Sequence, residues 1–107
     1  MTQKQIIDAA DKAGWDCKIE KTKNGYDICF NTYSPCGQDV NCEISVRTLD
    51  KVPDEVHEYW QAYDPEEEAM LWFGANRGEP ESLRELLDDM DWVDNMLEDL
   101  STELCNI

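Results

Sequence analysis

Basic residues, histidine and long apolar runs are scarce in this chain of 107 residues. It has nine Lys and Arg residues against 25 Asp and Glu, one histidine, and a net charge of −16. Such a field repels nucleic-acid phosphates and anionic membrane surfaces, which argues against direct nucleic-acid binding. The apolar runs are shorter than the roughly 18 residues that a membrane span needs, and the N-terminus lacks the apolar core of a signal peptide. We therefore expect a cytoplasmic protein.

Glycine and proline are also few, with five and four residues, while 41% of the chain is hydrophobic. This composition is typical of a folded protein, and the length predicts a single domain over residues 1–107. The charge is unevenly distributed, because residues 1–53 carry a net −1 and residues 54–107 a net −15. The C-terminal half is therefore expected to attract basic partners or cations.

The five cysteines form no CxxC pair, and their odd count argues against a disulfide framework. Zinc needs about four clustered soft ligands, so we expect no metal and no cofactor, and we interpret the cysteines as buried, reduced thiols. Cys17 and Cys42 fall on the apolar phase of predicted strands, whereas Cys36 in a turn and Cys105 near the terminus should be exposed. A nucleophilic cysteine paired with His57 stays open, although no spacing suggests it.

The periodicity predicts an α+β fold with the order α-β-β-β-α-α-α: an N-terminal helix, a three-stranded antiparallel meander, then two or three C-terminal helices. Residues 2–13 have helical apolar spacing, with Thr2 as the cap and Gly14 as the stop. Residues 15–48 alternate apolar and polar side chains, which indicates strands with one buried face.

Turns and helix starts divide the predicted elements. We expect the first hairpin to turn at Asn24-Gly25, where both positions would need positive φ, and the second at Pro35-Gly37 as a type I turn. Pro53 and Pro65 suit the first positions of two helices. A capping box at Ser82 and Glu85 would begin one continuous helix over residues 82–104.

Enzymatic motifs are missing or broken. His57-Glu58 begins like the zinc-binding HExxH motif, but Gln61 occupies the place of the second histidine. The element order is similar to that of a double-stranded RNA-binding domain, yet the last helix has Arg84 among nine carboxylates where such domains place basic residues. We therefore expect no enzymatic activity, and an enzyme that uses Cys36 or a carboxylate pair is the third-ranked hypothesis.

The stretch LLDDMDWVDNMLEDL, residues 86–100, contains six carboxylates and no basic residue. It is not a calcium loop, because Val93 takes a ligand position and no glycine supplies the turn. An apolar stripe at spacings of four and three instead predicts a helix that faces the core: Leu86, Met90, Val93, Leu97, Leu100 and Leu104.

The other side of this helix is predicted to be an acidic partner-binding face. The nine carboxylates of the whole helix, from Glu81 to Leu104, give about one charge per 4 Å of axis, close to the spacing of about 3.4 Å in one DNA strand. The alternative is an ordinary solvated face. Trp92 on this side is either covered by Trp60, Trp72 or Phe73, or is an exposed anchor. The predicted face comprises Glu81, Glu85, Asp88, Asp91, Trp92, Glu98 and Asp99, extended by Glu66, Glu67 and Glu68.

Two stretches, TYSPCGQD and LWFGANRGEPESLRELLDDMDW, are similar to those of small acidic proteins from phages and other mobile elements of gut bacteria. The resemblance implies no site residues and no catalytic activity. It implies a mobile-element context, in which acidic proteins that imitate DNA block restriction or CRISPR enzymes.

These observations predict a non-enzymatic acidic domain that binds a basic protein surface, with a DNA-mimic inhibitor of a nucleic-acid-binding defence protein as the specific hypothesis. The alternative is a helical interaction or assembly module, such as a homodimer, in which the charge serves solubility.

Overall fold

The computed structural model of this chain describes residues 1–75 and 82–107. Its elements are α1 (Gln3–Lys12), β1 (Asp16–Thr22), β2 (Gly25–Tyr33), β3 (Asp39–Val46), a short 3-10 turn (Leu49–Lys51), α2 (Val52–Ala62), α3 (Pro65–Ala75) and α4 (Leu83–Cys105). This order confirms the predicted α+β fold.

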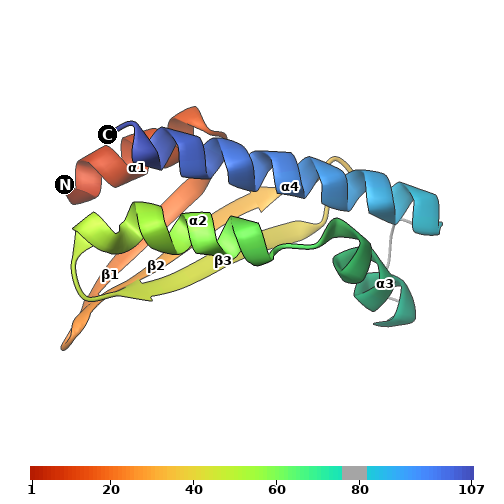
Figure 1. The fold of residues 1–107 in the computed structure, drawn as a ribbon, viewed down its shortest axis with the longest axis horizontal. Helices are drawn as coiled ribbons and strands as arrows, with labels where there is room; N and C mark the ends of the chain where they lie inside the picture. Colours follow the sequence, from red (N-terminus) through yellow and green to blue (C-terminus); the bar gives the residue numbers. More distant parts are fainter. Residues whose placement is uncertain (76–81) are drawn as a thin grey trace.

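The molecule has two layers, a three-stranded antiparallel sheet of order β1-β2-β3 and a layer of helices on one of its faces (Figure 1). α4 contacts α1, α2 and α3, and α2 also packs against β3. Side chains from the inner face of the sheet meet the apolar faces of α1, α2 and α4 in one core, which includes Ile28, Phe30, Cys42 and Ile44 from the sheet. α3 packs instead on the N-terminal half of α4, where Ala69 contacts the region of Leu86 and Met90.

α1 begins and ends as the sequence predicts. Thr2 and Gln5 form a capping box, in which each side chain accepts a hydrogen bond from the backbone N–H of the other. Gly14 follows the helix with a φ of +88°, and Trp15 N–H donates to Ala10 O at 2.8 Å. The indole of Trp15, which is 2% exposed, then donates to Met96 O of α4 at 3.0 Å. This bond ties the α1–β1 junction to the longest helix.

The strand phasing is confirmed, and one turn is displaced. Thr22 and Gly25 are paired across the first hairpin, so its two-residue loop is Lys23-Asn24 and the predicted turn at Asn24-Gly25 is wrong by one residue. The reason is a close approach: a Cβ on Gly25 would collide with the carbonyl oxygen of Val46 and lie 2.7 Å from Arg47 Cα. The glycine is needed for strand contact at this position.

The second turn forms as predicted. Gly37 N–H donates to Ser34 O at 2.8 Å, which closes the turn over Pro35 and Cys36. Gly37 itself has a φ of +83°. The Ser34 hydroxyl accepts from Gln38 N–H at 3.0 Å, so the loop between β2 and β3 is held at both of its ends.

α4 is one continuous helix of 23 residues, begun by Ser82, whose side chain accepts from Glu85 N–H at 3.2 Å. All six residues of the predicted apolar stripe are buried. Full burial of one such side chain stabilises the fold by roughly 1.5–3 kcal/mol. The stripe therefore fixes which side of α4 faces the sheet and which side faces away from it.

Candidate acidic binding surface

The outer face of α4 presents five exposed carboxylates. Because the apolar stripe holds one side of the helix against the sheet, side chains half a turn away project outward. The five are Glu85, Asp88, Asp91, Glu98 and Asp99, and they are called the acidic face below. Glu81, also predicted for this face, lies outside the described residues.

The charge of the acidic face is not neutralised by the described part of the chain. The ion pairs formed there are Met1 N-terminus with Asp50, Lys4 with Asp8, and Lys12 with Glu103 at 3.4 Å. None of these involves a carboxylate of the acidic face. Arg84, on the first turn of the same helix, is exposed and forms no ion pair with a described residue. The five carboxylates are therefore exposed and have no ion-pair partner within residues 1–75 and 82–107.

Two other carboxylates of α4 serve the fold instead. Asp94 accepts a hydrogen bond from the indole N–H of Trp60 at 3.0 Å, which joins α4 to α2. Asp89 is only 2% exposed, and its Oδ1 accepts from the backbone N–H of Cys36 at 3.1 Å. Its Oδ2 has no hydrogen-bond partner among the described residues. The sequence signal for Asp89 was its position on the apolar phase, three residues after Leu86.

Trp92 is half-buried and packs against the main core, so it is neither fully covered nor a fully exposed anchor. It lies on the flank of α4 that also carries Met96, whose Cε approaches Gly14 after α1. Trp60 bonds to Asp94 on a different flank, about 200° around the helix from Trp92 at 3.6 residues per turn. The predicted cover by Trp60 is therefore wrong. The side chains of Trp72 and Phe73 lie outside the described part of the chain.

The three carboxylates at the start of α3 point in different directions. Glu66 and Glu67 are exposed on the first turn, where Asp64 caps the helix by accepting from Glu66 N–H at 3.0 Å. Glu68 is half-buried and lines a shallow hollow of about 240 Å³ with Tyr59 and Tyr63. Burial, and after it the charge of Glu68, raises the pKa of the Tyr63 hydroxyl. Glu68 thus faces the β3 side, whereas Glu66 and Glu67 remain available beside α4.

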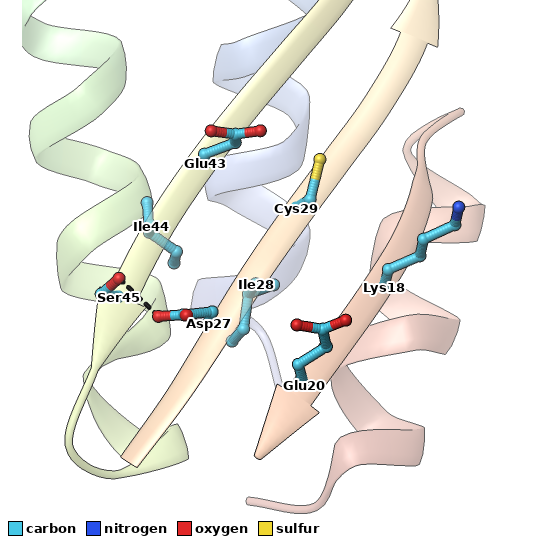
Figure 2. Close-up of a pocket in the computed structure, with 8 residues that line it drawn as sticks. All are labelled: Lys18, Glu20, Asp27, Ile28, Cys29, Glu43, Ile44 and Ser45. Atoms are coloured by element: carbon cyan, nitrogen blue, oxygen red, sulfur yellow. Dashed lines mark hydrogen bonds between the residues drawn. The ribbon is translucent and has the colours of Figure 1, made fainter. Parts of the chain in front are cut away.

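The open face of the sheet, opposite the helices, was not singled out by the sequence. Figure 2 shows its polar side chains around a shallow depression of about 530 Å³. Asp27 accepts a hydrogen bond from the Ser45 hydroxyl at 2.7 Å across β2 and β3. Further along, the Asn31 amide donates to Asp39 at 2.6 Å and to Asn41 at 2.9 Å. These hydrogen bonds link side chains of β2 and β3 across the outer surface of the sheet.

The thiols of the sheet and the histidine of α2 have separate surroundings. Burial, and secondarily the charge of Glu43, raises the pKa of the Cys29 thiol on the open face, which is the wrong direction for a reactive thiolate. His57 is on α2, where its Nδ1 lies 3.3 Å from the Ser101 hydroxyl. Only Cys42 is fully buried: Cys17 and Cys29 are half-buried, and Cys36 and Cys105 are exposed. Cys17 was predicted to be buried and is only half-buried, so that prediction is wrong, while the burial of Cys42 and the exposure of Cys36 and Cys105 are confirmed.

Within residues 1–75 and 82–107, no group of three or more His, Cys, Asp or Glu side chains is arranged to hold a metal ion. No helix in these ranges is long and apolar enough to cross a bilayer. No protein-family model matches the chain, and no curated protein or solved structure shows significant similarity to it.

Proposed function

We propose that this chain is a non-enzymatic protein-binding domain that acts as a DNA mimic. The acidic face of α4 would occupy the basic groove of a nucleic-acid-binding protein, such as a defence protein that a phage or mobile element must block. The observation that carries this proposal is the row of five exposed carboxylates without an ion-pair partner among the described residues.

The spacing of the row suits a groove that holds a nucleic-acid strand. Glu85 and Asp99 are 14 residues apart, or about 21 Å along the axis at about 1.5 Å per residue. Five carboxylates over that length are spaced about 5 Å apart on average, against about 3.4 Å between phosphates along one DNA strand. Glu66 and Glu67 add exposed charge beside the N-terminal half of α4.

The row is also rigidly mounted. α4 is held against α1, α2 and the sheet through its buried stripe, and its flanks are joined to α1 by Lys12–Glu103 and to α2 by Trp60–Asp94. A charge pattern held in place before binding loses little conformational entropy on association. Like charges one turn apart, such as Asp88 and Asp91, cost a few tenths of a kcal/mol in helix stability. A binding role accounts for this repeated cost better than solubility does.

Affinity capture from host lysate at low and high salt, followed by a displacement assay, tests the proposal. Mimicry predicts that the captured protein binds DNA, that this chain displaces DNA from it, and that binding weakens steeply as salt rises. A partner that does not bind DNA, or one held equally well at high salt, would contradict mimicry.

The alternative function, a helical assembly module whose charge serves solubility, predicts an apolar interface that salt does not weaken. The apolar stripe of α4 is unavailable for such an interface, because all six of its residues are buried within the fold. Exposed apolar side chains on α3, Met70 at 59% and Leu71 at 61%, offer a helical surface for this alternative.

A further inference from the structure

β1 is an edge strand that pairs only with β2. Thr22 and Gly25 flank the two-residue turn as partners in that ladder. Such partners hydrogen-bond to each other, so Thr22 directs its backbone groups toward β2. Because this direction alternates along an antiparallel strand, the N–H and C=O groups of Cys17, Ile19 and Lys21 point away from the sheet.

The outer edge of β3 confirms this alternation independently. Asn41 lies in one row with Asn31 and Asp16, and the alternation turns its carbonyl outward. That carbonyl accepts a hydrogen bond from the Tyr59 hydroxyl of α2 at 3.3 Å. α2 therefore reaches the β3 edge at Asn41, and the outward backbone groups of β1 have no hydrogen-bond partner in the described parts of the chain.

We propose that the β1 edge is the interface between two copies of this chain. The two β1 strands pair antiparallel about a two-fold axis at Ile19 and form one continuous six-stranded sheet. This interface is self-complementary, as a two-fold dimer requires, and it satisfies the backbone groups that an edge strand leaves exposed.

The length and the charges of β1 together select this register, because Ile19 is the middle residue of Asp16–Thr22. With the axis at Ile19, Lys18 of each copy lies opposite Glu20 of the other, in the non-hydrogen-bonded positions where facing side chains are closest. Both side chains are exposed on the open face of the sheet, as Figure 2 shows. An axis at Lys18 or at Glu20 would instead place like charges opposite each other.

Apolar side chains lie on the helix side of the same edge. Ile19 is half-buried at the margin of the core and would meet Ile19 of the second copy. Ile7 of α1 is 40% exposed and lies about 140° around the helix from Lys12, which pairs with Glu103 of α4. Ile7 is therefore on the flank of α1 that faces away from α4. A second copy beside β1 would cover both isoleucines.

The distribution of charge favours this edge over every acidic surface of the molecule. Residues 1–24, which include α1 and β1, contain five lysines and four carboxylates, whereas residues 25–107 contain 21 carboxylates and four basic residues. Two copies that approach through β1 meet at the segment without an excess of negative charge. The acidic faces on α4 remain available in such a dimer. The dimer proposal therefore does not depend on the proposed DNA-mimic function.

Sedimentation equilibrium of the full chain, over a range of concentrations, tests the proposal. The wild type is expected to dimerise, and Lys18→Glu or Glu20→Lys should each weaken the dissociation constant roughly tenfold or more, because both cross-strand pairs become repulsive. The double variant Lys18→Glu/Glu20→Lys should restore the dimer. Lys23→Glu, in the turn outside the paired residues, makes the same charge change and should leave the dimer intact.

A mixture of the Lys18→Glu and Glu20→Lys chains should form a heterodimer, because each supplies the charge that the other lacks. Circular dichroism checks that each variant is folded. A wild type that stays monomeric at all concentrations overturns the proposal. A dimer that Lys18→Glu does not weaken, or that the double variant does not restore, overturns it equally.

Discussion

At the scale of single residues, Asp89 is the least expected side chain of the molecule. A carboxylate on the apolar stripe of α4 is 2% exposed, yet it joins that helix to the β2–β3 loop through the backbone N–H of Cys36. Burial of a charged group without full compensation costs free energy. We therefore expect that Asp89 contributes to stability through its hydrogen bond to Cys36 and not through its charge.

Two substitutions of Asp89 distinguish the contribution of its hydrogen bond to Cys36 from that of its charge. Asp89→Ala removes the hydrogen bond between this side chain and the backbone N–H of Cys36 and should lower the free energy of unfolding by about 1–3 kcal/mol. Asp89→Asn keeps a carbonyl oxygen for that N–H and removes the charge, so it should be clearly more stable than the alanine variant. Urea denaturation measures both. Equal losses for the two variants would show that the hydrogen bond to Cys36 is not what Asp89 contributes.

The cysteines provide a second test at this scale. Burial raises the pKa of Cys42 from its ordinary value of 9.0 to about 12, and that of Cys17 to about 11, and thiol reagents attack the thiolate. Near neutral pH, Cys36 and Cys105 should label quickly, Cys17 slowly, and Cys42 slowest of all. Mass spectrometry of timed samples gives the order, and a denatured sample, in which all five label, is the control. Fast labelling of Cys42 would show that the phasing of β3 is wrong.

At the scale of elements, the periodic spacing of apolar residues predicted most of the helices and strands. The stripe of α4 and the alternation in the strands depend on which residues must leave water, and a sequence displays that directly. The first hairpin was placed one residue too late because Asn24-Gly25 is itself a favoured turn pair. The close approach of Gly25 to Val46 and Arg47 joins the start of β2 to the end of β3, residues about 21 positions apart, and local patterns do not record it.

Two glycines in the turn regions should therefore respond differently to alanine. At Gly25 a Cβ collides with the backbone of Val46 and Arg47, so Gly25→Ala must separate paired strands and should destabilise the fold by several kcal/mol. At Gly37 a Cβ meets open space and the φ of +83° is the only obstacle, so Gly37→Ala should cost about 1–2 kcal/mol. Thermal or urea denaturation ranks them. A larger loss at Gly37 than at Gly25 would contradict the packing of the β2 start against the end of β3.

At the scale of the whole molecule, the surface has regions that differ in charge and in exposed backbone hydrogen-bonding groups, and each region suits a different kind of contact. Among the described residues, the carboxylates of the acidic face of α4 have no ion-pair partner, the outward backbone groups of β1 have no hydrogen-bond partner, and α2 reaches the β3 edge at Asn41. The sequence predicted the five carboxylates of the acidic face, because they are opposite a clear apolar stripe. It could not predict the separate roles of Glu68, Asp89 and Asp94, since these depend on tertiary neighbours.

The central claim is that the acidic face is a binding surface, and charge reversal tests it most directly. The change of Asp88, Asp91 and Glu98 to Lys together should abolish partner binding, while the free energy of unfolding stays level or rises slightly as repulsion along α4 is relieved. The matched control changes Asp11, Glu43 and Asp54 to Lys, three exposed carboxylates away from α4 that give the same net charge. Binding of the captured partner, measured by calorimetry at one salt concentration, should survive in the control and be lost in the α4 variant. Equal binding by both variants would contradict the claim.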